Sequence, residues 1–325
     1  MKVLVADKIE KEALDGLKEI GCEVSSQPDL DPDTIGAAVA ELKPAVVVVR
    51  STKFREPAIK QAEDSIKLVV RAGSGYDNID HAYAATKGIG VSNCPGMNAV
   101  AVAEVTIGHL ISLDRRLVDQ TIDLRGGRWD KKGFGVAKGL KGRKLLIIGT
   151  GAIGLEVIKR AQAFGMQITA QSRNLTEAQA TAMGCNWIPF TREAIEQTLP
   201  HMDAVSVHVA ATPETKGLCG PGFFAAMADG AYFVNTSRGE IVDEAALVAA
   251  VESGKIRAAV DVYQDQPSFK EGEWNTPLAG PAGIYNSHHC GASTDQAQLA
   301  VAEEVVAIVK QFKDEGSFKH CVNGV

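Results

Sequence analysis

The 325-residue sequence lacks the features that mark several large classes of protein. No apolar run approaches the roughly 18 residues that a membrane-spanning helix requires, so we expect no membrane association. The N-terminal stretch returns to charge at Asp7, which leaves no apolar core for a secretory leader. Lys and Arg total 34 against 40 Asp and Glu, with no block of one sign. Nucleic-acid binding, which calls for a basic stripe, is therefore not expected.

Cysteine pairs are also missing. The six cysteines are scattered and form no CxxC motif, which argues against a disulfide framework or a structural zinc site. His288, His289 and Cys290 are adjacent, but neighbouring residues rarely ligate one ion with good geometry, so we predict no metal. The pattern favours reduced thiols in a cytoplasmic protein.

Short β-branched runs alternate with helical stretches along most of the chain. This alternation predicts an α/β fold with parallel strands and right-handed crossovers, in two doubly wound sheets of the Rossmann or flavodoxin-like kind. A single long helix is expected over Asn98–Leu117, and a last amphipathic helix over Thr294–Lys313. The expected strands are Val3–Ala6, Pro44–Val49, Leu68–Val70, Gly90–Ser92, Lys144–Ile148, Gln167–Ala170, Ala204–His208, Ala231–Asn235 and Ala258–Val262.

A glycine motif follows the expected strand Lys144–Ile148 and opens a helix. Gly149 would allow the tight turn, Gly151 the approach of a pyrophosphate, and Gly154 the close packing of helix on strand. The free N–H groups at the start of such a helix attract phosphates. We therefore predict a dinucleotide site here; the alternative is an ordinary turn without a ligand.

The next strand ends without the acidic residue that would hold the ribose of NAD. Ser172 stands at that place, 18 positions after Gly154, and Arg173 follows it. A hydroxyl and a guanidinium can both bind a 2′-phosphate, which a carboxylate would repel. The pair predicts NADP(H) in preference to NAD(H), although NAD(H) stays possible if Arg173 is only a solvated loop residue.

Three polar patches follow expected strands in the second half of the chain. They are Asn235–Gly239, Asp261–Pro267 and His288–Thr294. Ligands of open α/β sheets bind at the carboxyl ends of the strands, so these patches should converge. Reduction of a ketone needs a proton donor, commonly His, and a cation such as Arg that holds the carboxylate and polarises the carbonyl.

Taken together, these residues resemble the D-isomer-specific 2-hydroxyacid dehydrogenases over essentially the whole chain. The resemblance implies a discontinuous substrate-binding domain (1–97 and 292–325), a dinucleotide-binding domain (98–291), a cleft between them, and a homodimer formed near the long helix. Within the family the D-3-phosphoglycerate dehydrogenase branch is most alike, through Val49–Lys53, Val70–Asp80 and Gly291–Gln298. That branch implies a role in serine biosynthesis. Because the chain ends at Val325, neither a regulatory domain nor feedback control by serine is expected.

The resemblance also implies roles for individual residues. Arg238 would bind the carboxylate and carbonyl, and His289 would be the acid and base. The positions that match substrate-facing residues of the family are Arg50, Ser51, Arg71, Ser74, Gly75 and Asn98. Cofactor-binding positions are Gly149, Gly151, Ala152, Ile153, Gly154, Ser172, Arg173, Val209, Thr236, Ser237, Asp261, Gly291 and Ala292.

One departure from the family concerns its third catalytic residue. The family has Glu directly before the Pro of the strand-end motif, and this chain has Gln266 before Pro267. Gln can hold the imidazole tautomer but supplies no negative charge. We therefore expect a working but slower enzyme whose acid limb lies at lower pH. Asp265 could substitute only if its side chain turned to the same side as Gln266, which an extended stretch disfavours.

Three functions remain open from the sequence. The first is a dehydrogenase of the phosphoglycerate type, acting on a small 2-hydroxy or 2-keto acid. The second is an NADPH-dependent glyoxylate or hydroxypyruvate reductase, which Ser172 and Arg173 favour. The third is a cofactor-sensing, non-catalytic binding protein, which Gln266 favours and the presence of Arg238 and His289 disfavours.

Overall fold

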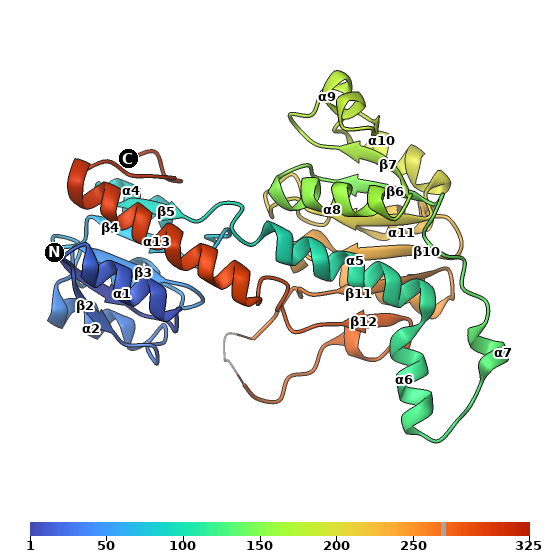
Figure 1. The fold of residues 1–325 in the computed structure, drawn as a ribbon, viewed down its shortest axis with the longest axis horizontal. Coiled ribbons are helices and arrows are strands. Elements are labelled where there is room, and N and C mark those ends of the chain that lie inside the picture. Colours follow the sequence, from blue (N-terminus) through green and yellow to red (C-terminus); the bar gives the residue numbers. More distant parts are fainter. Residues whose placement is uncertain (268–270) are drawn as a thin grey trace. The chain divides into compact units, whose positions relative to one another are not determined.

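A computed structural model describes residues 1–267 and 271–325. The chain divides into two compact units, each drawn in Figure 1. Unit 1 comprises residues 1–98 and 293–325, and unit 2 comprises residues 99–292. Each unit is built on its own parallel sheet, of five and seven strands, which confirms the predicted α/β class with two doubly wound sheets. Among the described helices, none is both long and apolar enough to cross a membrane.

Unit 1 has the strand order β2-β1-β3-β4-β5, which is the flavodoxin-like order. Its strands are β1 (Lys2–Val5), β2 (Glu23–Ser26), β3 (Val46–Val49), β4 (Leu68–Arg71) and β5 (Gly90–Asn93). Its helices are α1 (Lys11–Glu19), α2 (Ile35–Leu42), α3 (Glu56–Ile59), α4 (His81–Thr86) and α13 (Asp295–Glu315).

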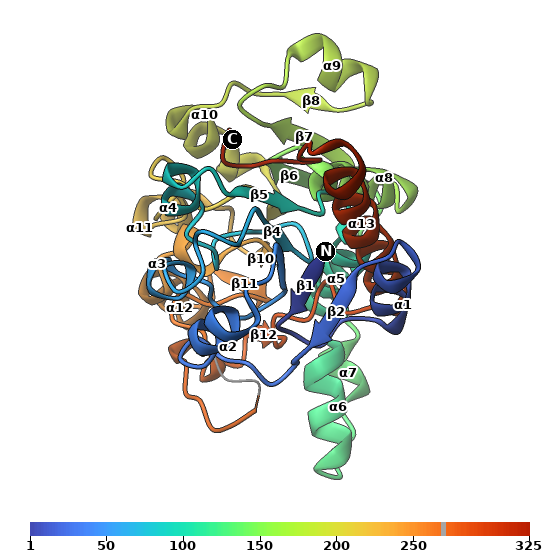
Figure 2. The same ribbon diagram turned by 90° about the vertical axis from the view of Figure 1, so that its left-hand side faces the viewer.

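The sheet of unit 1 is covered on both faces. Figure 2 shows α1 and α13 on one side of it and α2, α3 and α4 on the other. All four residues of β3 are buried, because successive side chains point to opposite faces and each face has a helical layer. Val46 and Val48 pack with Val305 and Ile308 of α13, whereas Val47 packs on the α2 side. The continuous β-branched run of the sequence therefore reflects burial on two sides.

Unit 2 has the order β12-β11-β10-β9-β6-β7-β8, in which the first strand β6 lies beside both β7 and β9. Its strands are β6 (Lys144–Ile148), β7 (Gln167–Gln171), β8 (Asn186–Trp187), β9 (Ala204–Val207), β10 (Ala231–Asn235), β11 (Ile256–Val260) and β12 (Ile284–Asn286). Its helices are α5 (Ala99–Arg115), α6 (Leu117–Arg125), α7 (Lys131–Phe134), α8 (Ala152–Ala163), α9 (Glu177–Ala182), α10 (Arg192–Thr198), α11 (Pro221–Ala226) and α12 (Glu244–Glu252). Short 3₁₀ turns span Leu199–His201, Gly239–Ile241 and Pro277–Ala279.

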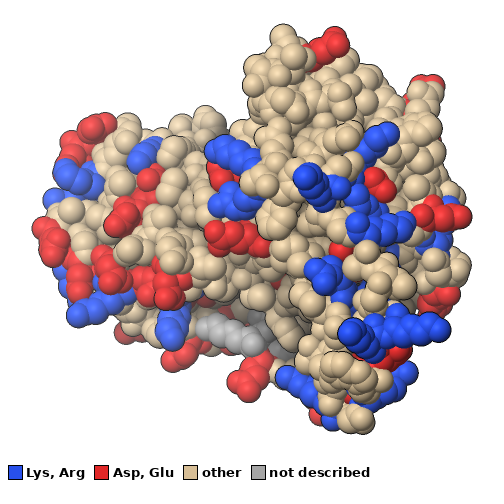
Figure 3. Space-filling view, turned by 45° about the vertical axis from the view of Figure 1, so that its right-hand side comes forward, with Lys and Arg blue, Asp and Glu red and all other residues tan. Residues whose placement is uncertain are grey.

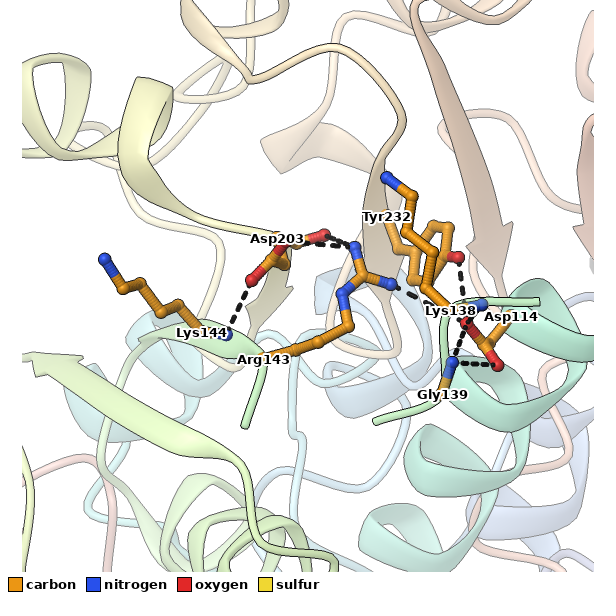
Figure 4. A network of polar contacts seen from close by, with 7 residues as sticks. All are labelled: Asp114, Lys138, Gly139, Arg143, Lys144, Asp203 and Tyr232. Carbon is orange, nitrogen blue, oxygen red and sulfur yellow. Dashed lines mark hydrogen bonds and ion pairs between the residues drawn. The ribbon is translucent and has the colours of Figure 1, made fainter. Parts of the chain in front are cut away.

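A polar network ties the amino ends of several strands in unit 2 to the end of α5 (Figure 4). The Asp114 carboxylate accepts hydrogen bonds from the backbone N–H of Gly139 and from the hydroxyl of Tyr232, at 3.1 and 3.2 Å. Arg143 stacks on the Tyr232 ring and pairs with Asp114 and Asp203, at 3.7 and 3.3 Å. Since this network lies at the amino ends of the strands, it leaves the carboxyl ends of the strands for ligands.

Several expectations about the elements were wrong in detail. The long helix does not continue through Leu117: it ends at Arg115, Arg116 takes a left-handed conformation with φ 52°, and α6 begins. Strand β9 ends before His208, and β11 runs from Ile256 to Val260 instead of Ala258 to Val262. Strands β2, β8 and β12 were not predicted, because two of them have only two or three residues and β2 is partly exposed.

Candidate active site

The glycine motif forms a tight turn between β6 and α8. Gly149 has φ +102°, and a Cβ there would lie 2.5 Å from the carbonyl oxygen of His208. A Cβ on Gly154 would lie 2.0 Å from the oxygen of Gly149, so both positions need glycine. A Cβ on Gly151 would meet no atom within 4 Å, which leaves open space beside the N-terminus of the twelve-residue helix α8. Ala152 and Ile153 form its first turn, and the geometry fits a bound pyrophosphate.

The loops after β7 and β9 flank this turn. The N–H of Gly149 donates to Gln171 of β7, and a Cβ on Gly149 would also touch Val209. Ser172 and Arg173 follow β7 directly; Ser172 is half-buried, whereas Arg173 is exposed and lies over the Phe190 ring. These are the places where the sequence predicts the adenosine ribose and its 2′ substituent.

Arg238 follows β10 and lies beside the loop after β11. Its Nη1 donates to the carbonyl of Ser237 at 2.7 Å, and its own carbonyl accepts from the Asn235 side chain at 2.9 Å. The Asn235 oxygen also accepts from the N–H and the hydroxyl of Ser237. Gly239 packs so closely on Tyr263 that a Cβ would lie 2.0 Å from its carbonyl carbon. The turn that carries the Arg238 guanidinium is thus held by the Asn235 hydrogen bonds before it and by the packing of Gly239 on Tyr263 after it.

The loop that carries His289 is anchored by Asp261, which follows β11 and is 2% exposed. The Asp261 carboxylate accepts from the Ser287 hydroxyl at 2.6 Å and from the N–H groups of Cys290 and Gly291 at 3.0 and 2.9 Å. Ser287 also contacts the His109 ring at 3.2 Å. Burial lowers the pKa of His109, and the nearby Asp261 charge opposes this shift only in part. The neutral imidazole of His109 therefore supports the loop from α5.

His289 itself is exposed, in a left-handed backbone conformation with φ 51°. Its Nδ1 lies 2.9 Å from Oε1 of Gln266. An amide oxygen only accepts, so Nδ1 carries the hydrogen and Nε2 is the atom that can exchange a proton with a substrate. The structure thus brings together His289 and the residue at the position where the family has its carboxylate.

Thr236, which also follows β10, carries a buried hydroxyl. Its Oγ1 lies 3.0 Å from Oγ1 of Thr106 on α5, and Thr106 also bonds back to Val102. Gly291 packs on α5 as well, because a Cβ there would lie 3.1 Å from Val105. Ala292, next in the chain, ends unit 2. The predicted cofactor positions after β10 and β12 are therefore held against one helix.

Three predicted substrate-binding residues lie at the carboxyl ends of β3 and β4 in unit 1, namely Arg50, Ser51 and Arg71. A buried carboxylate, Asp7, accepts from the backbone N–H groups of Arg50, Ser51 and Thr52 at 2.7, 3.1 and 3.1 Å. It also accepts from the hydroxyls of Ser51 and Thr52, at 2.9 and 3.1 Å. The Arg50 guanidinium donates to Gln298 of α13 at 3.0 Å. The hydrogen bonds to Asp7 therefore fix the backbone of the loop that carries Arg50.

The remaining predicted substrate residues lie on the neighbouring loops of unit 1. The Ser74 hydroxyl donates to the side chain of Asn98 at 2.7 Å, and Gly75 follows it. A Cβ on Gly73 would collide with the Arg71 guanidinium, which bends over this backbone. Asn78 donates to the carbonyl of Thr52 at 2.8 Å and so links this loop to that of Arg50.

Reasoning from the sequence missed three residues of this architecture. Asp7 and Ser287 bind partners far away in the chain, and Glu214, in the loop after β9, pairs with Arg173 at 3.6 Å. No spacing rule points to these three residues. The contact of His109 with Ser287, at 3.2 Å, likewise has no signal in the sequence. Within residues 1–267 and 271–325, no group of three or more His, Cys, Asp or Glu side chains could hold a metal ion. On the face that Figure 3 shows, Lys and Arg are interspersed with Asp and Glu.

Comparison with known proteins gave matches along nearly the whole chain. Residues 107–290 match the family described as D-isomer specific 2-hydroxyacid dehydrogenase, NAD binding domain. The chain is 35% identical to the D-3-phosphoglycerate dehydrogenase of Archaeoglobus fulgidus over 95% of its own length and 58% of that protein's. It is 36% identical to the hydroxypyruvate reductase of Thermotoga maritima, covering 97% of this chain and 98% of that protein.

A solved structure gives a similar match. It is the NADPH-dependent glyoxylate/hydroxypyruvate reductase from Sinorhizobium meliloti in complex with NADP and malonate, with a TM-score of 0.82 and 27% identity. The alignment covers 99% of this chain and 96% of that one.

Proposed function

Because the chain belongs to the D-isomer-specific 2-hydroxyacid dehydrogenases, we propose that it transfers a hydride between a nicotinamide cofactor and a small D-2-hydroxy acid or its 2-keto acid. The observation that carries this proposal is the His289–Gln266 contact, at the same sheet edge as Arg238 and the glycine turn. Residues 99–292 would form the dinucleotide-binding domain, and the rest the substrate domain. A cytoplasmic location stays a prediction that rests on the sequence alone.

Each side chain has a role that follows from its chemistry. When bound, the nicotinamide ring supplies or removes the hydride. Arg238 presents a forked guanidinium, which suits a substrate carboxylate and polarises the adjacent carbonyl. His289 gives a proton to the forming alkoxide through Nε2, or takes it from the hydroxyl in the reverse direction. Gln266 keeps the ring in the tautomer that this transfer requires.

For the substrate we propose 3-phosphohydroxypyruvate and its reduced form, which would place the enzyme in serine biosynthesis. The relative from Archaeoglobus fulgidus supports this choice by its name, but the chain spans only 58% of that protein. Arg50 and Arg71 offer two guanidinium groups on neighbouring strands for a phosphate or carboxylate. Ser51, Ser74, Gly75 and Asn98 complete the proposed substrate side.

Hydroxypyruvate or glyoxylate is the second candidate substrate. It is supported by the relative from Thermotoga maritima, which the chain covers almost completely. Ser172 and Arg173 support NADP(H) as the preferred cofactor, with NAD(H) as the alternative. A panel of 2-keto acids, each with NADH and NADPH and followed by nicotinamide absorbance, decides among these possibilities.

His289→Gln and Arg238→Gln should abolish turnover in this assay, and His288→Gln, an exposed neighbour, serves as the matched control. Tight NADPH binding without turnover on any 2-keto acid would instead support a cofactor-sensing protein.

We also propose a homodimer, formed through the arm that α6 and α7 make. Within the arm, whose residues are all described, α6 has no buried residue, although it carries Leu117, Val118, Ile122 and Leu124. Trp129 is 77% exposed and lines a groove with Leu124 and Phe134. Exposed apolar side chains gathered on one projecting segment are typical of an interface.

A further inference from the structure

An ion pair bridges two loops at the carboxyl edge of the sheet in unit 2. Nη2 of Arg173, after β7, lies 3.6 Å from Oε2 of Glu214, in the loop after β9. Because β6 lies between β7 and β9 in the sheet, this pair spans the end of β6, where the glycine turn begins. The Glu214 carboxylate thus lies near the predicted place of the 2′ substituent of the adenosine ribose, although no sequence motif identifies the loop that carries it.

The position of this pair coincides with the point where the strand order reverses. Chain connections lead from β6 outward to β7 and β8, and then return to β9 on the other side. Open α/β sheets bind their ligands at such a point. Gly149 touches both flanking loops, since its N–H donates to Gln171 and its Cα faces the carbonyl of His208. The acidic residue missing after β7 therefore has a counterpart on the neighbouring loop.

The Glu214 carboxylate is oriented by its own loop. The hydroxyl of Thr212 donates to Oε2 of Glu214 at 2.7 Å, and this bond, before the Arg173 charge, lowers the pKa of Glu214. Arg173 in turn lies over the Phe190 ring, with 5.8 Å between the guanidinium carbon and the ring centre. The side chains of Arg173 and Glu214 are 61% and 64% exposed. Exposed pairs of this kind are weak, so a stronger anion can displace Glu214.

Resting on the proposed function, we propose that Glu214 determines the choice between the two nicotinamide dinucleotides. With NAD(H), its carboxylate accepts a hydrogen bond from the ribose 2′-hydroxyl, in place of the missing acid after β7. With NADP(H), the 2′-phosphate takes over Arg173 together with the Ser172 hydroxyl, and Glu214 has to turn away. Glu214 therefore favours NAD(H) and opposes the preference that Ser172 and Arg173 create.

The test is a binding measurement that does not depend on turnover. Dissociation constants for NADPH, NADH, 2′,5′-ADP and 5′-AMP are measured by titration calorimetry on the full chain and on Glu214→Gln. The variant should bind NADPH and 2′,5′-ADP up to about fivefold more tightly, the upper end of the range for an exposed ion pair. NADH affinity should fall, because the ribose 2′-hydroxyl loses its charged acceptor, so the ratio of NADPH affinity to NADH affinity rises.

The matched control is Asp229→Asn. It removes the same charge from another exposed pair, with Lys255 at 2.9 Å, at the amino end of β10 on the opposite edge of the sheet. A change in the affinity ratio of the same size in Asp229→Asn would assign the effect to net charge and refute the proposal.

A double-mutant cycle removes the remaining ambiguity. In an Arg173→Met background, Glu214→Gln should raise 2′,5′-ADP affinity by a smaller factor than in the wild-type background, because the cation for which Glu214 and the phosphate compete is gone. An unchanged NADPH-to-NADH ratio in Glu214→Gln alone would overturn the inference while leaving the proposed function intact. Failure of the wild-type chain to bind either dinucleotide would overturn the proposed function itself.

Discussion

At the scale of single residues, Gln266 holds His289 without contributing a charge. The contact of 2.9 Å between Nδ1 and the amide oxygen fixes the tautomer. A carboxylate at this place would in addition stabilise the imidazolium that forms when the alcohol is oxidised. Gln266 therefore still orients the imidazole, as the Glu of the family does, but it does not stabilise the positive charge of the imidazolium.

Gln266→Glu should restore the electrostatic stabilisation of protonated His289. We expect kcat to rise about tenfold or more, since positioned acid–base groups contribute factors of this order. The acid limb of the pH–rate profile should move to higher pH, because the charged partner favours protonated His289. Steady-state kinetics between pH 5 and 9 measure both effects. Gln264→Glu, two residues away and exposed, adds the same charge as a control; equal profiles for wild type and Gln266→Glu would contradict this account.

Asp7 supports the loop of the proposed substrate residues through five hydrogen bonds to Arg50, Ser51 and Thr52. In Asp7→Asn one acceptor oxygen becomes a donor, which faces N–H or hydroxyl groups that themselves donate. Bonds to a charged group are worth about 1.5–3 kcal/mol, so we expect KM for the 2-keto acid to rise about tenfold or more. NADPH affinity should stay unchanged. Asp33→Asn, on the exposed surface of unit 1, is the control; a KM like that of wild type would show that the loop keeps its place without Asp7.

The glycine turn between β6 and α8 follows from local spacing and could be predicted, whereas residues that act across the fold could not. Gly149 and Gly154 are recognisable because a strand, a turn and a helix are contiguous in sequence. Asp7 and Glu214 act through partners 43 and 41 positions away (50 − 7 and 214 − 173), so nothing near them in the sequence indicates their role. Ser287 is similar, because its partner Asp261 belongs to the preceding strand end.

At the scale of elements, the break between α5 and α6 has no sequence signal. Arg116 is neither Gly nor Pro, yet it takes a left-handed conformation there. Its guanidinium then pairs with Asp119 at 2.9 Å and stacks over Phe134 of α7, at 4.5 Å. These contacts hold α6 and α7 together as the arm. The stretch Asn98–Leu117 is rich in alanine and almost free of helix breakers, which is why one long helix was expected.

Ile122→Lys tests whether the arm is the dimer interface. Ile122 is 61% exposed on α6, so the substitution should hardly affect folding but should bury an unpaired charge in a dimer. We expect dimerisation to weaken at least about 30-fold, the effect of a central interface residue. Sedimentation velocity over a concentration series measures the shift. Phe164→Lys, 46% exposed at the end of α8, is the control for an apolar residue outside the arm; an unaltered dimer in Ile122→Lys would locate the interface elsewhere.

The strands that could be predicted are those buried on both faces. Val46–Val49 and Leu145–Ile148 are continuous apolar runs within β3 and β6, and their strand assignment is confirmed. Strand β2, Glu23–Ser26, is an edge strand with exposed and half-buried residues, and its composition resembles a loop. Strands β8 and β12 are too short for any periodicity to develop.

At the scale of the whole molecule, buried histidines couple stability to pH. Burial lowers the pKa of His208 to about 3, and it lowers the pKa of His109 as well. In the unfolded chain both groups should titrate near 6.5. Below that pH the unfolded state binds more protons than the folded state, so the free energy of unfolding falls as the pH decreases. Above it both states are neutral at these positions and the effect vanishes.

Unfolding of unit 2 between pH 7 and pH 5 tests this linkage. His208 should cost up to about 1.4 kcal/mol per pH unit below 6.5, and His208→Gln should remove this contribution. The three tryptophans, Trp129, Trp187 and Trp274, all lie in unit 2, so their fluorescence in urea follows this unit. His201→Gln, at an exposed position, is the control; parallel pH curves for wild type and His208→Gln would refute the role of His208.

The insertion of unit 2 within unit 1 has a consequence for biosynthesis. During translation the five strands of unit 1 leave the ribosome first, but Val305, Ile308 and Val309 of α13 complete one face of their sheet. Roughly 200 residues separate β5 from this helix, which at ordinary elongation rates corresponds to a delay on the order of ten seconds or more. Throughout that interval Val3, Val46 and Leu68 lack the part of their apolar cover that α13 supplies, so the nascent chain presents a surface that chaperones recognise until this helix emerges.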